Sequence, residues 1–288
     1  MSDEAAISET QGWLPTQNVL PDVTEITESK VIEKITNLER YLSLMMEITR
    51  SKGRFWFRGT RNSAYDLEPS LYRHPTVKDA NALIELEWTL LSDFRHRAPP
   101  FTTHIPTKDL EVLFLMQHFG VPTRLLDWSE SPFVALFFAL ENARLKDADT
   151  HDASVWVLDP IGLNSLAAEF REGSDRVYGA HADELGGYEP RPEGKRVTQR
   201  LPSALHGIHN SPRIVAQRGT FVVFGKDTIP MNKHPKLNGV DSIIRRVDID
   251  KAVKRDMFEA LTNMGVSDSV IYPDLDGLGR EIKNYRGF

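Results

Sequence analysis

The feature that most restricts the fold of this chain is a short helical segment that is apolar on every side. Ser131 and Pro132 are typical of a helix start, with serine as the N-cap and proline at the first helical position. The apolar run of residues 133–140 follows directly. Because a helix without a polar face has to be buried, the rest of the chain must build layers of structure around this segment.

The composition is that of a chain able to form such a core. With 288 residues, 40% of them hydrophobic, it is long enough for one large domain or two modest ones. The lack of cysteine excludes disulfides, thiolate metal sites and a cysteine nucleophile. A net charge of −6 is not that of a general nucleic-acid or membrane binder, so a nucleic-acid target would need local contacts. Without a long apolar run or a signal-like start, the chain is predicted to be cytoplasmic, with no membrane partner.

The first 29 residues differ from the remainder. They contain acidic residues but no lysine or arginine, and their apolar residues follow no period. This pattern predicts a flexible acidic arm over residues 1–29, which could dock a partner protein, followed by one domain over residues 30–288. Residues 29–50 carry apolar side chains at every third or fourth position, which predicts an amphipathic helix at the start of that domain.

Hydrophobic patterns and turn residues predict an α+β domain with a mixed or antiparallel sheet and surrounding helices. The predicted strands are residues 54–58, 154–158, 213–216, 221–224, 242–247 and 270–272. The predicted helices, besides those already described, are residues 79–97, 107–119, 251–263 and a last helix with Asp274 as its N-cap. Residues 173–210, which mix glycine, proline and charge, are predicted to form a long irregular excursion.

The aromatic segment around Arg58 is the first candidate for a binding site. If Phe55 and Phe57 face the core, strand alternation places Trp56 and Arg58 together on the opposite face. A guanidinium group beside an indole can hold an anionic or planar ligand by bidentate contacts and stacking. The structural alternative is that Arg58 pairs with an acid and Trp56 only packs.

The second candidate is the polar cluster just before the apolar helix, where the unpaired N–H groups of a helix start favour anions. Its members are Thr123, Arg124, Asp127, Ser129 and Ser131. The simpler interpretation is that Ser131 caps the helix while Asp127 bonds to Arg124 or to loop amides. The two interpretations are compatible with each other.

Gln117 and His118 stand at the end of a predicted helix. His118 could carry a proton near neutral pH, or it could simply favour the helix dipole. Among the other histidines, only His206 and His209 have a metal-ligand spacing, and no acidic third ligand stands beside them. The sequence therefore predicts no metal site.

Three separated motifs, in order, resemble the FRG domain family, named for its Phe-Arg-Gly element. They are Phe55-Trp-Phe-Arg-Gly59, Gln117-His-Phe-Gly-Val-Pro-Thr-Arg-Leu-Leu-Asp-Trp-Ser-Glu-Ser-Pro132 and Arg213-Ile-Val-Ala-Gln-Arg-Gly-Thr-Phe221. Residues 268–278 also resemble the end of that family's domain, so the likeness spans roughly residues 32–283. It implies a toxin or antiviral defence role.

The same residues support a weaker analogy to the ADP-ribosyltransferase fold, which implies NAD as a ligand. Arg58, the segment from Ser129 to Ser131 and the start of the strand after Gln217 follow the order expected for that fold. The chain departs from it where a catalytic glutamate is expected, because Arg213 or Gln217 stands there. Glu184 or Glu189 could substitute.

The sequence thus favours a nucleotide-handling enzyme, ADP-ribosyltransferase-like, with a cleft that binds a small anionic ligand. The alternatives are a binding module that senses a nucleotide or a phosphorylated ligand, with nucleic acid as one target, and a scaffold that acts through its acidic arm. The candidate catalytic residues are Arg58, His118, Asp127 and Gln217. The candidate ligand-binding residues are Trp56, Gly59, Gln117, Thr123, Arg124, Ser129, Ser131 and Arg213.

Overall fold

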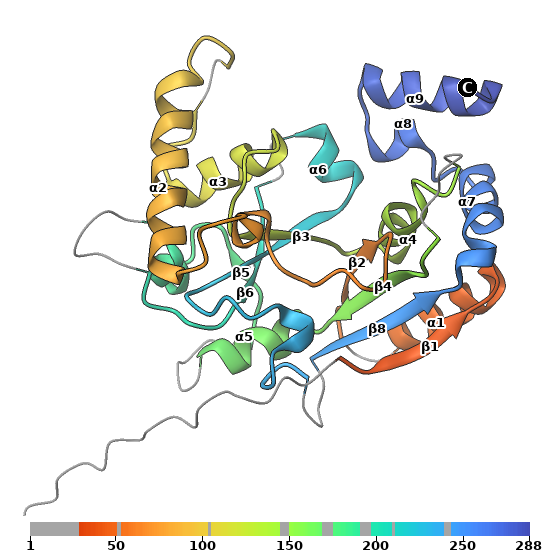
Figure 1. The fold of residues 1–288 in the computed structure, drawn as a ribbon, viewed down its shortest axis with the longest axis horizontal. Helices are drawn as coiled ribbons and strands as arrows, with labels where there is room; N and C mark the ends of the chain where they lie inside the picture. The colour runs from red at the N-terminus through yellow and green to blue at the C-terminus, as the bar shows by residue number, and fades with distance from the viewer. Residues whose placement is uncertain are drawn as a thin grey trace, which may run out of the picture.

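The fold is an α+β arrangement of helices around one mixed sheet (Figure 1), as the sequence predicts. The computed structural model describes residues 29–50, 53–102, 105–144, 150–168, 175–190, 197–208, 211–238 and 243–288. The eight strands found in these ranges follow the order β1-β8-β4-β2-β3-β7-β6-β5. The pairs β1–β8 and β5–β6 are parallel, and the other neighbours are antiparallel.

The strands are β1 (Val31–Ile35), β2 (Trp56–Thr60), β3 (Leu125–Ser129), β4 (Ala153–Leu158), β5 (Tyr178–Gly179), β6 (Ser203–His206), β7 (Gly219–Val223) and β8 (Ile244–Ile249). The α-helices are α1 (Leu38–Arg50), α2 (Ala80–Arg97), α3 (Asp109–His118), α4 (Pro132–Leu140), α5 (Pro160–Ala168), α6 (Pro212–Ala216), α7 (Lys254–Asn263), α8 (Asp268–Ile271) and α9 (Leu275–Arg286). No helix in these ranges combines the length and the apolar character needed to cross a bilayer.

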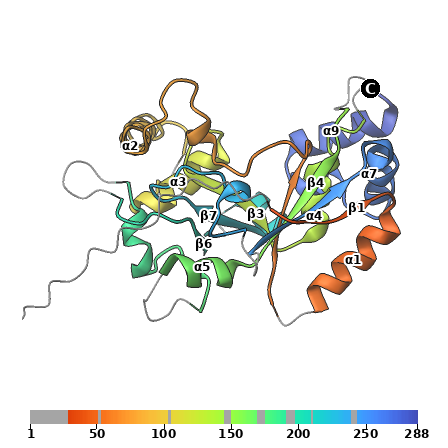
Figure 2. The same ribbon diagram turned by 60° about the horizontal axis from the view of Figure 1, so that its bottom comes forward.

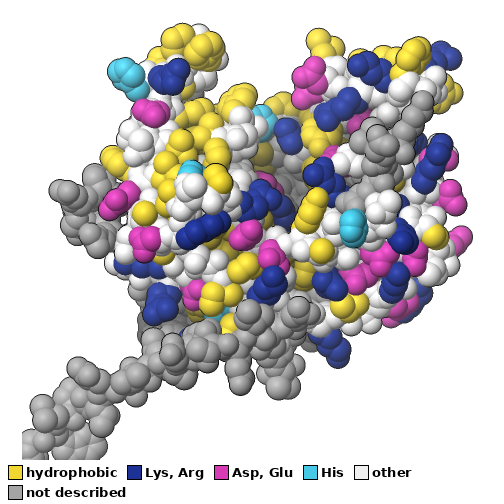
Figure 3. Space-filling model, viewed as in Figure 1, with side chains coloured by type: hydrophobic (Ala, Val, Ile, Leu, Met, Phe, Trp, Pro, Cys, Tyr) yellow, Lys and Arg dark blue, Asp and Glu magenta, His cyan; other side chains and the backbone are white. Residues whose placement is uncertain are grey.

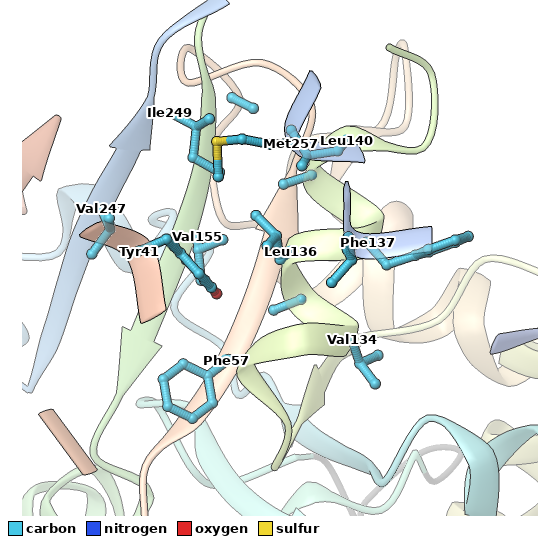
Figure 4. Packing of buried hydrophobic residues seen from close by; sticks show 14 of the residues in the cluster. Tyr41, Phe57, Val134, Leu136, Phe137, Leu140, Val155, Val247, Ile249 and Met257 are labelled. Carbon is cyan, nitrogen blue, oxygen red and sulfur yellow. The ribbon is translucent and has the colours of Figure 1, made fainter. Parts of the chain in front are cut away.

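The apolar helix lies at the centre of one core, as predicted. Helix α4 packs on β2 and β4, with Leu136 and Phe137 fully buried (Figure 4). Helices α1 and α7 complete this layer through Tyr41, Met257 and their neighbours. Ser131 accepts a hydrogen bond from the Val134 amide at the start of α4, as expected for an N-cap.

Two further clusters cover the rest of the sheet. Helix α3 packs over Leu125 and Phe221, whose side chains lie on the sheet face that also carries α4, as strand register shows. Trp56, Trp128 and Trp156 point to the opposite face, where α5 lies (Figure 2). Helices α3 and α4 are therefore neighbours on one face, over the middle of the sheet.

Gly59 explains why α4 approaches β2 so closely. A Cβ atom on Gly59 would stand 1.9 Å from the Ala135 carbonyl oxygen and 2.6 Å from the Ala139 amide nitrogen. Only a residue without a side chain allows strand and helix to meet at this distance. The glycine of the Phe-Arg-Gly element thus has a packing role.

Several local predictions are confirmed. Helices α2, α3, α7 and α9 lie where the patterns place them, and Asp79 and Asp274 cap α2 and α9 by accepting amide hydrogen bonds. Just before β7, Arg218 adopts the left-handed region at φ 46°. The strands predicted around Phe57, Val155, Val222 and Val247 shift by only a few residues.

Other local predictions are wrong, and tertiary contacts explain the differences. Residues 29–50 divide into β1 and α1, because Val31–Ile35 pairs with the edge of β8. Residues 213–216 belong to helix α6, capped by Ser211, instead of a strand. Residues 270–272 contribute to helix α8 and its end. Strand β3 and helix α5 were not predicted at all.

Two predictions concern residues outside the described ranges. The acidic arm falls on residues 1–28, and the irregular excursion over residues 173–210 is described only in part. Its described portion holds β5, β6 and a 3₁₀-helix, Asp183–Tyr188. The division into an arm and one domain from residue 30 stays a prediction.

Candidate functional site

A cavity of about 350 Å³ lies between α3 and α4, at the point where β2 and β3 separate. These two strands pair at a single position, Phe57 with Ser129. Beyond that pair the Arg58 side chain spans the gap and donates from Nη1 to the Asp127 carbonyl oxygen, 2.5 Å away. We call this hollow the α3–α4 cavity.

Arg58 lines the cavity without a carboxylate partner among the described residues. Its Nε atom is buried and forms no hydrogen bond there. Burial lowers the pKa of Arg58, an effect that the charge of Asp127 opposes. Since buried polar groups normally have partners, the Arg58 guanidinium group leaves hydrogen-bonding capacity for a ligand.

Asp127 is oriented by a short relay of side chains. Gln117 donates from Nε2 to Asp127 Oδ2 over 2.9 Å, and Thr123 donates from Oγ1 to Gln117 Oε1 over 2.7 Å. The Thr123 hydroxyl fixes which end of the Gln117 amide faces Asp127. Thr123 is itself buried and does not line the cavity.

His118, the last residue of α3, follows Gln117 directly and also lines the cavity. Burial and the nearby charge of Arg213 lower the pKa of this imidazole, while Asp274 and Asp127 act in the opposite direction. The ring is therefore mainly neutral near pH 7, which makes it a proton acceptor rather than a cation.

Arg213 contributes a second guanidinium group to the cavity. Its Cζ atom lies 4.8 Å from the centre of the Tyr272 ring, against which Arg280 also packs at 3.9 Å. Arg213 has no carboxylate partner within the part of the chain that the structure describes. Figure 3 shows Lys and Arg side chains gathered along the hollow between the α2–α3 side and the α8–α9 side of the molecule.

Ser129 and Gln217 line the cavity but are also used within the fold. The Ser129 hydroxyl donates to the Gln217 carbonyl oxygen over 2.7 Å and accepts from the Ser131 amide over 3.0 Å. The Gln217 amide donates from Nε2 to the Ile271 carbonyl oxygen over 3.1 Å. Both residues therefore join β3, the turn before β7 and α8 around the cavity.

The predicted role of Arg124 in an anion cleft is corrected by its position. Arg124 is fully buried and forms an ion pair with Glu87, which is equally buried, at 2.7 Å. Its remaining nitrogen atoms donate to the carbonyl oxygens of Phe224 and Tyr188. Each of the three guanidinium nitrogens forms a hydrogen bond inside the protein, so Arg124 has a structural role.

Two further candidates lie outside the cavity. Strand register places Trp56 and Arg58 on the same sheet face, as predicted, but the Trp56 indole is buried in the core, with its ring centre 5.7 Å from that of His206, and it does not line the cavity. Ser131 caps α4 and does not line the cavity. The predicted site residues that the structure brings together are Arg58, Gly59, Gln117, His118, Asp127, Ser129, Arg213 and Gln217.

Glu141 is a cavity residue that the sequence reasoning missed. It follows α4 directly, and its Oε2 accepts a hydrogen bond from the Tyr272 hydroxyl at 3.0 Å. Burial raises the pKa of this carboxyl. A signal was available, since Val134, Phe138 and Glu141 follow the helical spacing of one face. The predicted substitutes lie elsewhere, because Glu184 pairs with Arg176 and Glu189 does not line the cavity.

The structure is thus an α+β fold with a cavity, lined in part by arginines, beside its central strands. Residues 53–148 match the FRG domain family, so this part of the chain is similar to that family. Comparison with the curated proteins and with the solved structures finds no match. No three His, Asp or Glu side chains come together as a metal-binding group in the ranges that the structure describes.

The matched segment runs from just before β2 to just beyond α4. It contains β2, α3, β3 and α4, all of which contribute residues to the cavity lining. The three residues of its Phe-Arg-Gly element have different roles. Phe57 fills the core, Arg58 reaches the cavity, and Gly59 lets α4 approach. Arg213 and Tyr272 come from beyond the matched segment.

Proposed function

We propose that the α3–α4 cavity binds an anionic ligand of the nucleotide class. The supporting observation is that Arg58 and Arg213 line one cavity without carboxylate partners in the described residues, in a chain whose net charge is −6. Guanidinium groups bind phosphate through charge-assisted, often bidentate, hydrogen bonds. An acidic protein that leaves two of them unpaired at one cavity is suited to such a ligand.

The size and lining of the cavity fit this proposal. Its volume of about 350 Å³ lies within the usual range for small-molecule sites, roughly 300–1,000 Å³. Phe114, Phe138 and Phe221 supply apolar surface next to the polar groups, which suits a planar base.

We infer further that the site is catalytic, with NAD as the first substrate to test. In an ADP-ribosyl transfer, the bond between ribose and nicotinamide breaks, nicotinamide leaves, and an acceptor nucleophile bonds to the ribose carbon. Arg58 and Arg213 would hold the phosphates, and neutral His118 would take the proton of the acceptor. The family resemblance supports a toxin or antiviral defence role for this activity in the cytoplasm.

A binding module without chemistry is the second candidate. It is favoured by the internal hydrogen bonds of Ser129 and Gln217, and by the absence of Glu184 and Glu189 from the cavity lining. Under this alternative the ligand stabilises the protein but is released unchanged.

Calorimetric titration with NAD, ADP and pyrophosphate tests the proposal. We expect binding of at least one of them, and about 10- to 100-fold weaker binding by Arg213→Gln, since a hydrogen bond to a charged group is worth about 1.5–3 kcal/mol. Arg255→Gln is the matched control, because Arg255 lies on α7 and, among the described residues, pairs only with Glu259. Failure of all three ligands to bind would overturn the proposal. Release of nicotinamide from NAD would separate the enzyme from the binding module.

A further inference from the structure

Glu141 presents a fixed carboxylate to the α3–α4 cavity. One of its oxygens, Oε2, accepts the Tyr272 hydroxyl, and the other has no hydrogen-bond partner among the described residues. That second oxygen is not enclosed by protein, and Glu141 is one of the residues that line the cavity. The carboxylate can therefore accept hydrogen bonds from a ligand.

The surroundings of Glu141 hold it in place. Tyr272 is buried, and its ring packs against the guanidinium groups of Arg213 and Arg280. The backbone of the same segment is tied to the cavity by the hydrogen bond from Gln217 to Ile271. A carboxylate with so little freedom is prepared for one arrangement of donors, and it loses little conformational entropy when a ligand binds.

The local charges restrict which donors fit. Arg61 and Arg280 lie near enough to Glu141 to stabilise its charged form, against the effect of burial. Arg213 adds a further positive charge to the same wall. An ammonium group entering here would be repelled by these arginines, and a phosphate would be repelled by Glu141. A neutral hydroxyl avoids both costs.

We propose that Glu141 recognises sugar hydroxyl groups, so that the cavity selects a ribose phosphate over an anion without hydroxyls. This inference rests on the proposed function, since the anion is held by Arg58 and Arg213 while Glu141 contacts the sugar. A ligand that lacks the hydroxyls leaves one oxygen of a partly buried carboxylate without a hydrogen bond. Sites built to bond a hydroxyl reject such analogues strongly for this reason.

The test compares three ligands by calorimetry: ADP, its 2′,3′-dideoxy analogue and pyrophosphate. For the unmodified protein we expect ADP to bind about 10- to 100-fold more tightly than the dideoxy analogue, the range for hydrogen bonds to a charged group. Glu141→Gln keeps the shape but loses the charge, and should reduce this ratio to below about tenfold. Glu141→Met removes the acceptor and should bring the ratio close to one.

Pyrophosphate separates a role in recognition from a role in folding. Its affinity should be unchanged or higher in both Glu141 variants, because a repelling charge is removed. Glu85→Gln, an exposed position on α2, is the matched control and should leave all three affinities unchanged.

The outcomes distinguish this inference from the proposed function. Equal binding of ADP and its dideoxy analogue by the unmodified protein, or an unchanged ratio in both Glu141 variants, overturns the role of Glu141 and leaves anion binding intact. If none of the three ligands binds the unmodified protein, the proposed function fails, and the inference fails with it.

Discussion

Replacing Gly59 by alanine tests the claim that this glycine sets the distance between β2 and α4. The added Cβ atom would stand 1.9 Å from the Ala135 carbonyl oxygen, where ordinary contacts begin near 3.4 Å. The helix would have to move by about 3.4 − 1.9 = 1.5 Å. The obstacle is helix backbone, which cannot turn aside as a flexible side chain can.

The cost follows from what lies behind the helix. Leu136 and Phe137, on α4, are fully buried in the core, so a shift of α4 disturbs close packing on its far side as well. Overpacking of a core commonly costs about 1–3 kcal/mol. With backbone in the way, we expect the upper end, about 3 kcal/mol, or roughly 6–12 °C in melting temperature for a domain of this size.

Gly279→Ala is a matched control with the opposite expected sign. Gly279 lies inside α9, and a Cβ atom there meets nothing within 4 Å. Alanine should stabilise this helix by about 0.5–1 kcal/mol, because glycine loses more backbone entropy on folding. The two variants make the same chemical change and differ only in the space available.

The assay is urea unfolding followed by circular dichroism, with the midpoint and the slope fitted for each variant. We expect a lower midpoint for Gly59→Ala, a slightly higher midpoint for Gly279→Ala, and unchanged slopes. A Gly59→Ala protein as stable as the parent would refute the reasoning, since α4 could then move away at no cost.

Three further predictions concern ionisable groups. Glu87→Gln leaves the charge of buried Arg124 unpaired and should cost about 3–5 kcal/mol in urea unfolding, so a loss below about 1 kcal/mol would contradict a sealed ion pair. Burial raises the pKa of the Glu141 carboxyl above its ordinary value of 4.5, so the folded protein holds the carboxyl proton more tightly than the unfolded chain does. The Glu141 carboxyl therefore lowers the stability of the folded protein as the pH rises above 4.5. Glu141→Gln should thus gain stability relative to the parent between pH 4 and pH 7, and a constant difference would contradict this. The pKa of His118 is lowered, so the parent should lose stability as pH falls below 6.5, and His118→Gln should flatten that slope in unfolding curves at pH 7 and pH 5.

Part of the candidate site could be predicted from the sequence. The motifs placed Arg58, Gln117, His118, Asp127, Ser129, Arg213 and Gln217 in one site, and all of them line one cavity. The secondary structure under these residues was less reliable, since Arg213 stands on a helix where a strand was predicted.

Arg58 and Arg124 show where prediction from the sequence ends. Both are arginines in family motifs, and both were assigned to the anion cleft. Arg124 is neutralised by Glu87, which lies on α2, 37 residues earlier in the chain. Arg58 meets a carbonyl oxygen at a gap in the sheet. The residue type alone does not predict which acidic side chain an arginine will pair with in the folded protein.

What the sequence determined by itself was local or compositional. The apolar helix had to be buried, Asp79 and Asp274 had to cap helices, and the chain had to form an α+β domain, because caps and periodicity act over a few residues. Only the tertiary structure decided that residues 31–35 form a strand and that Glu141 faces the cavity. Those outcomes depend on partners such as β8 and Tyr272, which lie more than a hundred residues away in the chain. Pairing over such separations is set by the packing of the whole fold.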